Sequence, residues 1–219
     1  MSIRIDNVDV YGFEAAIRGM RSPKNSWDKS DSWWSSPYEN GTDKPLYIIG
    51  KDDMKLMQTL VKAGTDHGKF MRMIGISMDI TCNQVWWAEF DTYKIATVRN
   101  SCSKMHTIHI KSFVPDDFSH EGIDEVGAST KELFLTVLKE LEYLRVMFNT
   151  TKEKKYWRAI IELLPSGYNL RATVTLNYAV ARAQYHARKY HKMFEWHDYC
   201  HVLEKLPYSE LITMEGKNG

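Results

Sequence analysis

The stretch LPSGYNLRATVTLN, Leu164 to Asn177, joins one helix to a strand and that strand to another helix. Pro165 should end the first helix, because proline has no N–H to donate and its ring clashes with the preceding turn. Apolar and polar residues then alternate from Leu170 to Leu176, which is the period of a strand with one buried face. After Asn177 the spacing becomes helical as far as about Glu204. The stretch therefore predicts a buried strand that leads directly into a long helix.

The rest of the chain predicts more helix than strand. Alternation marks two further strands, at residues 3–13 and 74–80. A short helix should start near Glu14, and helical spacing marks four longer segments, around residues 54–61, 86–93, 133–148 and 157–164. The sequence has no internal repeat and no low-complexity tract. This organisation is α+β, rich in helix and poor in strands.

Several residues are typical of helix ends, and one connection is unusually long. The segment from Ser22 to Pro45 exceeds an ordinary loop, and its tryptophans, Trp27, Trp33 and Trp34, suggest that it is held against the domain. The candidate helix ends are Asp52 or Asp53 and Asn83 as N-caps, Gly64 as a C-cap, and Ser129 with Glu132 as a capping box.

Composition narrows the class of protein. At 219 residues, one domain over 1–219 is expected, and no apolar run approaches the ~18 residues that span a membrane. The N-terminus MSIRIDNVDVYGF has acidic residues where a signal peptide needs an apolar stretch, and the three cysteines form no CxxC pair. A net charge of +1 does not favour a nucleic-acid-binding surface. We therefore expect a cytoplasmic protein that binds small molecules, without a membrane or nucleic-acid partner.

The predicted C-terminal helix carries a row of polar groups. Asn177 and Arg188 are eleven positions apart, so they end only ~20° out of line on an α-helix. Ala181, Gln184 and Glu195 lie close to the same stripe, which spans ~27 Å. Such a row is typical of a solvated helix face, but it could also follow an elongated polar ligand. The buried strand just before it favours the second interpretation, because a central helix rarely exposes an arginine to bulk solvent.

These residues resemble the flavin-dependent thymidylate synthases. Members of that family have an LP pair, an aromatic-rich strand, an Asn, and eleven residues later an Arg on the same helix. Here the pair is Leu164-Pro165, and the Asn and Arg are Asn177 and Arg188. The resemblance implies that Arg188 is catalytic, contacting the uracil of dUMP and promoting its ionisation, and that Asn177 lies by the flavin.

A second match follows an aromatic segment. The family pattern is Q-W-x-R-H-R-x-x-S-x-N-E-x-S-x-R-Y, and the equivalent run here is Glu89 to His106, with one extra residue before Asn100. Its R-H-R portion, which holds the flavin, is replaced by Thr92-Tyr93-Lys94, and Met105-His106 replace the closing Arg-Tyr. The resemblance implies flavin contacts at Thr92, Tyr93, Lys94 and Thr97, and nucleotide contacts at Glu89, Asn100, Ser101, Ser103 and Lys104.

Four further residues are candidate ligand contacts. Arg158 could replace a phosphate-binding arginine that aligns with Ile161, and Arg99 could replace the one lost at Met105. GTDHGKF resembles a Gly-His segment of the family, which makes His67 a candidate neighbour of flavin or folate. Gln184, on the stripe with Arg188, completes the implied substrate contacts.

Structural roles for some of these residues stay open. A tyrosine such as Tyr93 at the end of an aromatic helix is usually a core residue. Lys94 could simply interact favourably with the negative, C-terminal end of that helix. His67 could equally be a structural hydrogen-bonding residue, and Cys102, without an activating neighbour in the pattern, is typical of a small structural residue.

The resemblance implies a fold and a reaction. The fold is α+β, a helix-rich single domain with a small, mostly antiparallel sheet and a long C-terminal helix. The reaction is methylation of dUMP to dTMP with FAD, NADPH and methylenetetrahydrofolate, by a homotetramer whose sites are shared between chains. Because the motif is altered, a related one-carbon transfer remains open, either hydroxymethylation or the use of dCMP. So does a non-catalytic flavin or nucleotide binder.

A zinc hydrolase is the alternative from another class. HDYCH places His197 and His201 at i and i+4 with Asp198 after the first, which echoes the HExxH pattern. A catalytic zinc also needs a definite third ligand, and helix geometry puts Cys200 on another face. The simpler interpretation is a polar, His-rich helix end without a metal.

Overall fold

The computed structural model describes residues 3–41 and 44–216 of the chain. Four antiparallel strands form its main sheet, in the spatial order β1-β4-β6-β5. The strands expected near residues 3–13, 74–80 and 170–176 are all present. The sheet consists of β1 Ile3–Tyr11, β4 Gly75–Asn83, β5 Val98–Ser101 and β6 Asn169–Asn177.

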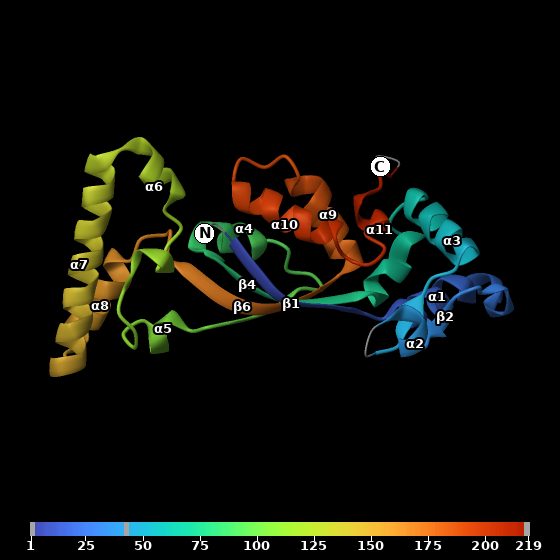
Figure 1. The fold of residues 1–219 in the computed structure, drawn as a ribbon, viewed down its shortest axis with the longest axis horizontal. Helices are drawn as coiled ribbons and strands as arrows, with labels where there is room; N and C mark the ends of the chain where they lie inside the picture. The colour runs from blue at the N-terminus through green and yellow to red at the C-terminus, as the bar shows by residue number, and fades with distance from the viewer. Residues whose placement is uncertain (1–2, 42–43, 217–219) are drawn as a thin grey trace.

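Helices make up most of the remaining structure (Figure 1). They are α1 Phe13–Arg21, α2 Pro37–Asn40, α3 Lys51–Lys62, α4 Gln84–Phe90, α5 Lys104–Thr107, α6 Glu121–Val126, α7 Ala128–Thr151, α8 Lys154–Leu163, α9 Tyr178–Arg188, α10 Phe194–Glu204 and α11 Glu210–Thr213. Short 3-10 helices occupy Ser22–Lys24, Trp27–Lys29, Gly68–Met73 and Pro115–Asp117, and β2 Trp33–Ser35 pairs with β3 Leu46–Ile48. The predicted helix-rich α+β class is confirmed. Within the described residues, no helix is both long and apolar enough to cross a membrane.

One face of the main sheet is covered by α4, α9 and α10 (Figure 1). Alternate residues of β4, Ile76, Met78 and Ile80, are buried and belong to the same hydrophobic cluster as the aromatic side chains of these helices. Trp86 of α4 lies 4.8 Å, centroid to centroid, from Trp196 of α10. The two-residue period of the strands thus places an apolar face beneath an aromatic helix layer.

The opposite face of the sheet is polar. Asp79 accepts hydrogen bonds from Thr173 at 2.5 Å and Asn7 at 2.8 Å, and it pairs with Arg171 at 2.8 Å. These contacts, led by the Thr173 hydroxyl, lower the pKa of the Asp79 carboxyl to about 2. The alternation therefore separates an apolar and a polar face, as the sequence of β6 predicts.

A second hydrophobic cluster lies at α7 and α8, apart from the sheet (Figure 1). Leu138, Leu141 and Leu144 of α7 are buried there with Ile160 of α8 and Phe118. The long amphipathic helix and the helix before Pro165 are confirmed. The predicted capping box is not present, because α7 starts after Gly127, whose backbone has φ 121°, and Ser129 is already inside the helix.

The long connection after α1 is held mainly by Asp53. Trp27, Trp33 and Trp34 remain about half exposed, at 52%, 52% and 56%, so they anchor the connection only in part. Asp53 instead pairs with Arg21 and accepts the hydroxyls of two serines within the connection. Residues 42 and 43 of this connection lie outside the described residues.

The start of α3 differs from the sequence-based expectation. Neither Asp52 nor Asp53 is its N-cap, which is Gly50. The carboxylate of Asp31 caps the helix from the connection, accepting the backbone N–H groups of Asp52 at 2.9 Å and Asp53 at 3.0 Å. A sequence pattern does not reveal such a cap, because the two partners are about twenty residues apart.

The long helix predicted from Asn177 to Glu204 is two helices. α9 ends at Arg188 and α10 begins at Phe194. His191 holds the turn between them: its Nδ1 accepts the Met193 N–H at 3.2 Å, and its carbonyl oxygen lies 2.7 Å from Nε2 of His197. After the break, Trp196 of α10 packs against Trp86 of α4.

Candidate functional site

Arg188 lies in the last turn of α9. Its position follows from the start of this helix, which is fixed by the end of β6 and by the helix cap. Asn177 ends β6 and caps α9, because its side-chain oxygen accepts the Val180 N–H at 3.0 Å. The predicted passage from strand to helix is therefore correct, and Asn177 has a structural role. Its side chain is 8% exposed.

The guanidinium of Arg188 is fixed by three neighbours, two from α4 and the turn after it and one from α10. Its Nη1 donates to Glu89 Oε2 at 2.8 Å, and its Nε donates to the Tyr93 hydroxyl at 3.1 Å. It also lies over the ring of Trp196, 4.8 Å from the centroid. Its side chain is 18% exposed, so Arg188 does not point into bulk solvent. We call Glu89, Tyr93, Arg188, His191 and Trp196 the arginine cluster.

Glu89 is the centre of this cluster. Its Oε2 also accepts the Trp196 indole N–H at 2.9 Å and lies 3.3 Å from Nε2 of His191. Because Trp196 is fully buried, its N–H requires an acceptor inside the protein. This anchor holds the carboxylate beside Arg188.

The expected stripe along one helix exists only in part. Ala181 and Gln184 lie on α9 with Arg188, and both are fully buried. The Gln184 side-chain oxygen accepts the Tyr199 hydroxyl at 2.6 Å, and its Nε2 is buried without a partner among the described residues. Glu195 belongs to α10 and accepts from Asn83 at 2.7 Å. Placing Glu195 on this stripe was wrong, because the helix breaks before it.

The residues expected at the flavin lie just beyond α4. Thr92 donates its hydroxyl to the Glu89 carbonyl at 2.7 Å, and Lys94 is exposed. The Thr97 hydroxyl is buried and finds no partner among the described residues. Only Tyr93 of this set touches Arg188. The structure therefore brings Tyr93, Glu89 and Arg188 together but leaves Lys94 outside the arginine cluster.

The residues expected at the nucleotide lie on β5 and at α5. Arg99 pairs with Asp91 at 2.5 Å and stacks over Trp87 at 3.8 Å, and Lys104 donates to Gln84. Asn100, Ser101 and Ser103 are exposed along the same edge. Arg158 is elsewhere, on α8, where it is exposed and pairs with Glu162.

Lys104 opens onto a cleft of about 300 Å³ at the end of the sheet. Arg4, Lys111 and Arg171 also line this cleft, together with Asp116, Asp117 and Tyr168. Burial raises the pKa of the Tyr168 phenol to about 12. Lysine and arginine side chains facing one hollow are suited to an anionic group.

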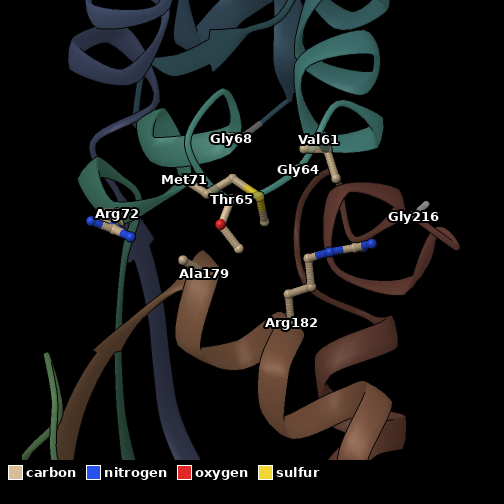
Figure 2. A pocket seen from close by; sticks show the side chains of 9 residues that line it. All are labelled: Val61, Gly64, Thr65, Gly68, Met71, Arg72, Ala179, Arg182 and Gly216. Carbon is tan, nitrogen blue, oxygen red and sulfur yellow. The ribbon is translucent and has the colours of Figure 1, made fainter. Parts of the chain in front are cut away.

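A second hollow lies near the first turns of α9, at the opposite end of this helix from Arg188 (Figure 2). It has a volume of about 170 Å³ and lies between the loop after α3, the start of α9 and the C-terminal segment. Thr65 and Gly68 flank the predicted His67, which is itself exposed. Arg182 of α9 reaches into it, and its Nη1 donates to the carbonyls of Leu211, Ile212 and Met214.

The HDYCH segment is integrated into α10. His197 Nε2 is engaged by the His191 carbonyl, and His201 is exposed. Burial raises the pKa of the Cys200 thiol to about 12, which disfavours the thiolate that a metal would bind. Among residues 3–41 and 44–216, no three His, Cys, Asp or Glu side chains gather as a metal site would require.

The chain was compared with known proteins. No protein-family model and no curated protein sequence matches it. Two solved structures of the flavin-dependent thymidylate synthase ThyX from Helicobacter pylori, both with FAD and dUMP, match it with a TM-score of 0.66. The match covers 98% of this chain and 98% and 97% of those chains, at 14% and 15% sequence identity. The chain shares the ThyX fold.

Sequence reasoning missed three residues of these sites. Trp196 and His191 complete the arginine cluster, and Arg182 lines the hollow of Figure 2. The sequence signal for Trp196 was weak, because an aromatic residue in a helix usually indicates a core position. Arg182 lies five residues after Asn177, about 140° around the helix from the stripe of Asn177 and Arg188, so the spacing gave no signal for it.

Proposed function

We propose that the chain methylates dUMP to dTMP, with FAD bound to the protein and with methylenetetrahydrofolate and NADPH as co-substrates. The arginine cluster, carried on a ThyX fold that extends over almost the whole chain, supports this proposal. Glu89 and Tyr93 reach Arg188 from a segment about a hundred residues away, so the fold brings these motif residues together.

In this proposal Arg188 contacts the uracil ring. A fixed guanidinium stabilises the negative charge that develops on the ring, and it needs no reorganisation because Glu89 and Trp196 already orient it. FAD supplies the reducing equivalents passed on from NADPH. The protein's task is to hold three planar molecules in order and to exclude water.

The hollow of Figure 2 fits part of a flavin. Its glycines permit close approach of a ring, and the Thr65 hydroxyl and the Arg182 guanidinium offer hydrogen bonds. Its volume of about 170 Å³ is below the roughly 300–1,000 Å³ of sites that enclose a whole drug-sized ligand. We therefore propose that one chain supplies only one wall of the flavin site.

A homotetramer with shared sites accounts for two separated parts of this chain. Glu89 lies in the last turn of α4 beside Arg188, whereas Gln84, at the first residue of α4, accepts from Lys104. One small nucleotide would have to span α4 to touch both parts of one chain. In an assembly, the base could contact Arg188 of one chain while Lys104, Ser103 and Asn100 of another hold the phosphate.

The test is a product assay on purified protein. The protein should carry yellow flavin, and incubation with dUMP, methylenetetrahydrofolate and NADPH should yield a nucleotide of the mass of dTMP. Parallel reactions with dCMP, and a search for hydroxymethyl products, separate the related one-carbon transfers. Bound flavin without any nucleotide product would indicate a non-catalytic binder, and the absence of flavin binding would reject the proposal.

A further inference from the structure

A cavity of about 660 Å³ lies between α6 and α7 on one side and the first residues of α4 and α10 on the other (Figure 1). The proposed reaction does not use it. Much of its wall is apolar, and the apolar residues that line it include Phe118, Ile123, Phe134, Pro165, Met193 and Phe194. Its volume falls within the roughly 300–1,000 Å³ of sites that enclose small molecules.

The cavity lies where the two hydrophobic clusters of the molecule meet without merging. Phe118 and Phe134 belong to the cluster at α7 and α8, whereas Met193 packs against the cluster at the sheet. Phe194, the first residue of α10, remains 73% exposed. A ligand that covers this ring would gain the free energy of removing apolar surface from water.

The charged groups on the wall are all of one sign. Glu121, Glu125 and Glu195 line the cavity, and no lysine or arginine of the described chain lines it with them. Asn83 donates to Oε1 of Glu195 at 2.7 Å, which holds this carboxylate on the wall. Glu121 has interactions of its own, so Glu125 and Glu195 are the carboxylates that a ligand would meet.

The neighbourhood of the cavity is negative. The pKa of the buried Cys82 thiol is raised, first by burial and then by the charge of Glu195. The basic side chains of His120 and Lys131 contact Asp124, which does not line the cavity. An apolar wall with carboxylates and no cation favours a positively charged ligand and repels an anion.

We propose that this cavity binds a small organic cation, a protonated amine carried on an aromatic body. The aromatic body lies against Phe134 and Phe194, and the ammonium group donates to Glu125 and Glu195. Phosphate and carboxylate groups make dUMP, FAD, NADPH and methylenetetrahydrofolate anionic, so the cavity suits none of them. The site is therefore additional to the proposed reaction.

The experiment compares two probes that differ in charge but hardly in shape. Tryptamine carries an amine that is protonated at about pH 7.5, and tryptophol has a neutral hydroxyl in its place. Isothermal titration calorimetry of the purified full-length protein, without nucleotide or folate, measures both affinities. Tryptamine should bind about tenfold more tightly than tryptophol, because a hydrogen bond between charged groups is stronger than one to a neutral donor.

Three variants assign the preference to this cavity. The double variant Glu125→Gln with Glu195→Gln keeps the shape of the wall and should bind the two probes equally. Phe194→Ala should weaken both probes by a similar factor, because it removes apolar contact and no charge. Glu140→Gln, at an exposed position of α7, is the matched control and should keep the tenfold preference.

Three results would overturn the inference. They are the absence of tryptamine binding at about 10 mM, equal affinity of the wild type for the two probes, and a preference that the double glutamine variant retains. The titration contains no substrate of the proposed reaction, so each of these results leaves the assay for dTMP formation to decide that reaction separately.

Discussion

Two arginine–carboxylate pairs in this molecule serve different purposes. Arg21 of α1 pairs with Asp53 of α3 at 2.6 Å, and their side chains are 6% and 0% exposed. Arg188 of α9 pairs with Glu89 of α4 at 2.8 Å, and their side chains are 18% and 31% exposed. Both pairs join segments far apart in the sequence. They differ in how many of the carboxylate oxygens accept hydrogen bonds from the protein.

Asp53 uses both of its oxygens. Arg21 donates to Oδ1, and the Ser30 and Ser32 hydroxyls, each at 2.6 Å, and the Asp31 N–H donate to Oδ2. Glu89 uses only Oε2 for contacts within the described chain. A buried pair with every acceptor filled fixes a fold, whereas a partly exposed pair with a spare donor and acceptor can bind a ligand. The first pair is therefore structural, and the second has the exposure that the proposed function requires.

The largest expected effect comes from breaking the buried pair. Asp53→Ala leaves the Arg21 guanidinium buried without a counter-charge and removes the acceptor of both serines. The free energy of unfolding should fall by about 3–5 kcal/mol, measured by urea denaturation. The control is Asp52→Ala, a change at the exposed neighbour of Asp53 on α3. It should change the free energy of unfolding by less than about 0.5 kcal/mol. A loss for Asp53→Ala no larger than that of the control would contradict the structural role of this pair.

Breaking the second pair should affect activity more than stability. Arg188→Ala should reduce turnover of dUMP by about 100- to 1,000-fold, because the charge stabiliser at the ring is lost. The free energy of unfolding should change by only about 1 kcal/mol or less, since the pair is partly exposed and Glu89 keeps Trp196 as a donor. Steady-state kinetics and urea denaturation measure the two effects. Full activity in Arg188→Ala, with Lys139→Ala on α7 as control, would show that Arg188 does not contact the reacting base.

The smallest expected effect concerns the cap on α3, beside the buried pair. Backbone hydrogen bonds, first from Asp52, lower the pKa of the Asp31 carboxyl below its ordinary value. The ionised cap therefore stabilises the protein fully above about pH 4, and this stabilisation is lost as the pH falls through the lowered folded-state pKa. Asp31→Ala should cost about 1 kcal/mol at pH 7, and the difference from wild type should shrink at lower pH.

Urea denaturation at several pH values tests this cap. The exposed Asp28→Ala serves as the control for loss of a nearby carboxylate. A difference between Asp31→Ala and wild type that stays constant from pH 7 to pH 3 would show that the ionised cap does not stabilise α3.

Much of the fold could be predicted from local patterns. The alternation in β4 and β6, the end of α8 before Pro165, and the cap at Asn83 all appear in the structure, where the Asn83 side chain accepts the Trp86 N–H at 2.9 Å. These features depend on residues within a few positions of one another. Hydrophobic periodicity and capping chemistry therefore suffice to place them.

The sites were less accessible to sequence reasoning. The motif comparison selected Arg188, Glu89 and Tyr93, which the structure brings together. It could not show that Glu89 neutralises Arg188 or that Trp196 anchors Glu89. Those facts depend on contacts between segments about a hundred residues apart. No local period encodes them.

The sequence by itself determined the helix-rich α+β class and the strand that enters α9 at Asn177, because backbone geometry and burial impose short periods on the residues. Tertiary structure alone decided that the helix breaks after Arg188, that Asp31 caps α3, and that Glu89 holds Arg188. The physical reason is that buried polar groups require partners, and the partner is whichever segment the packed core brings within hydrogen-bond distance.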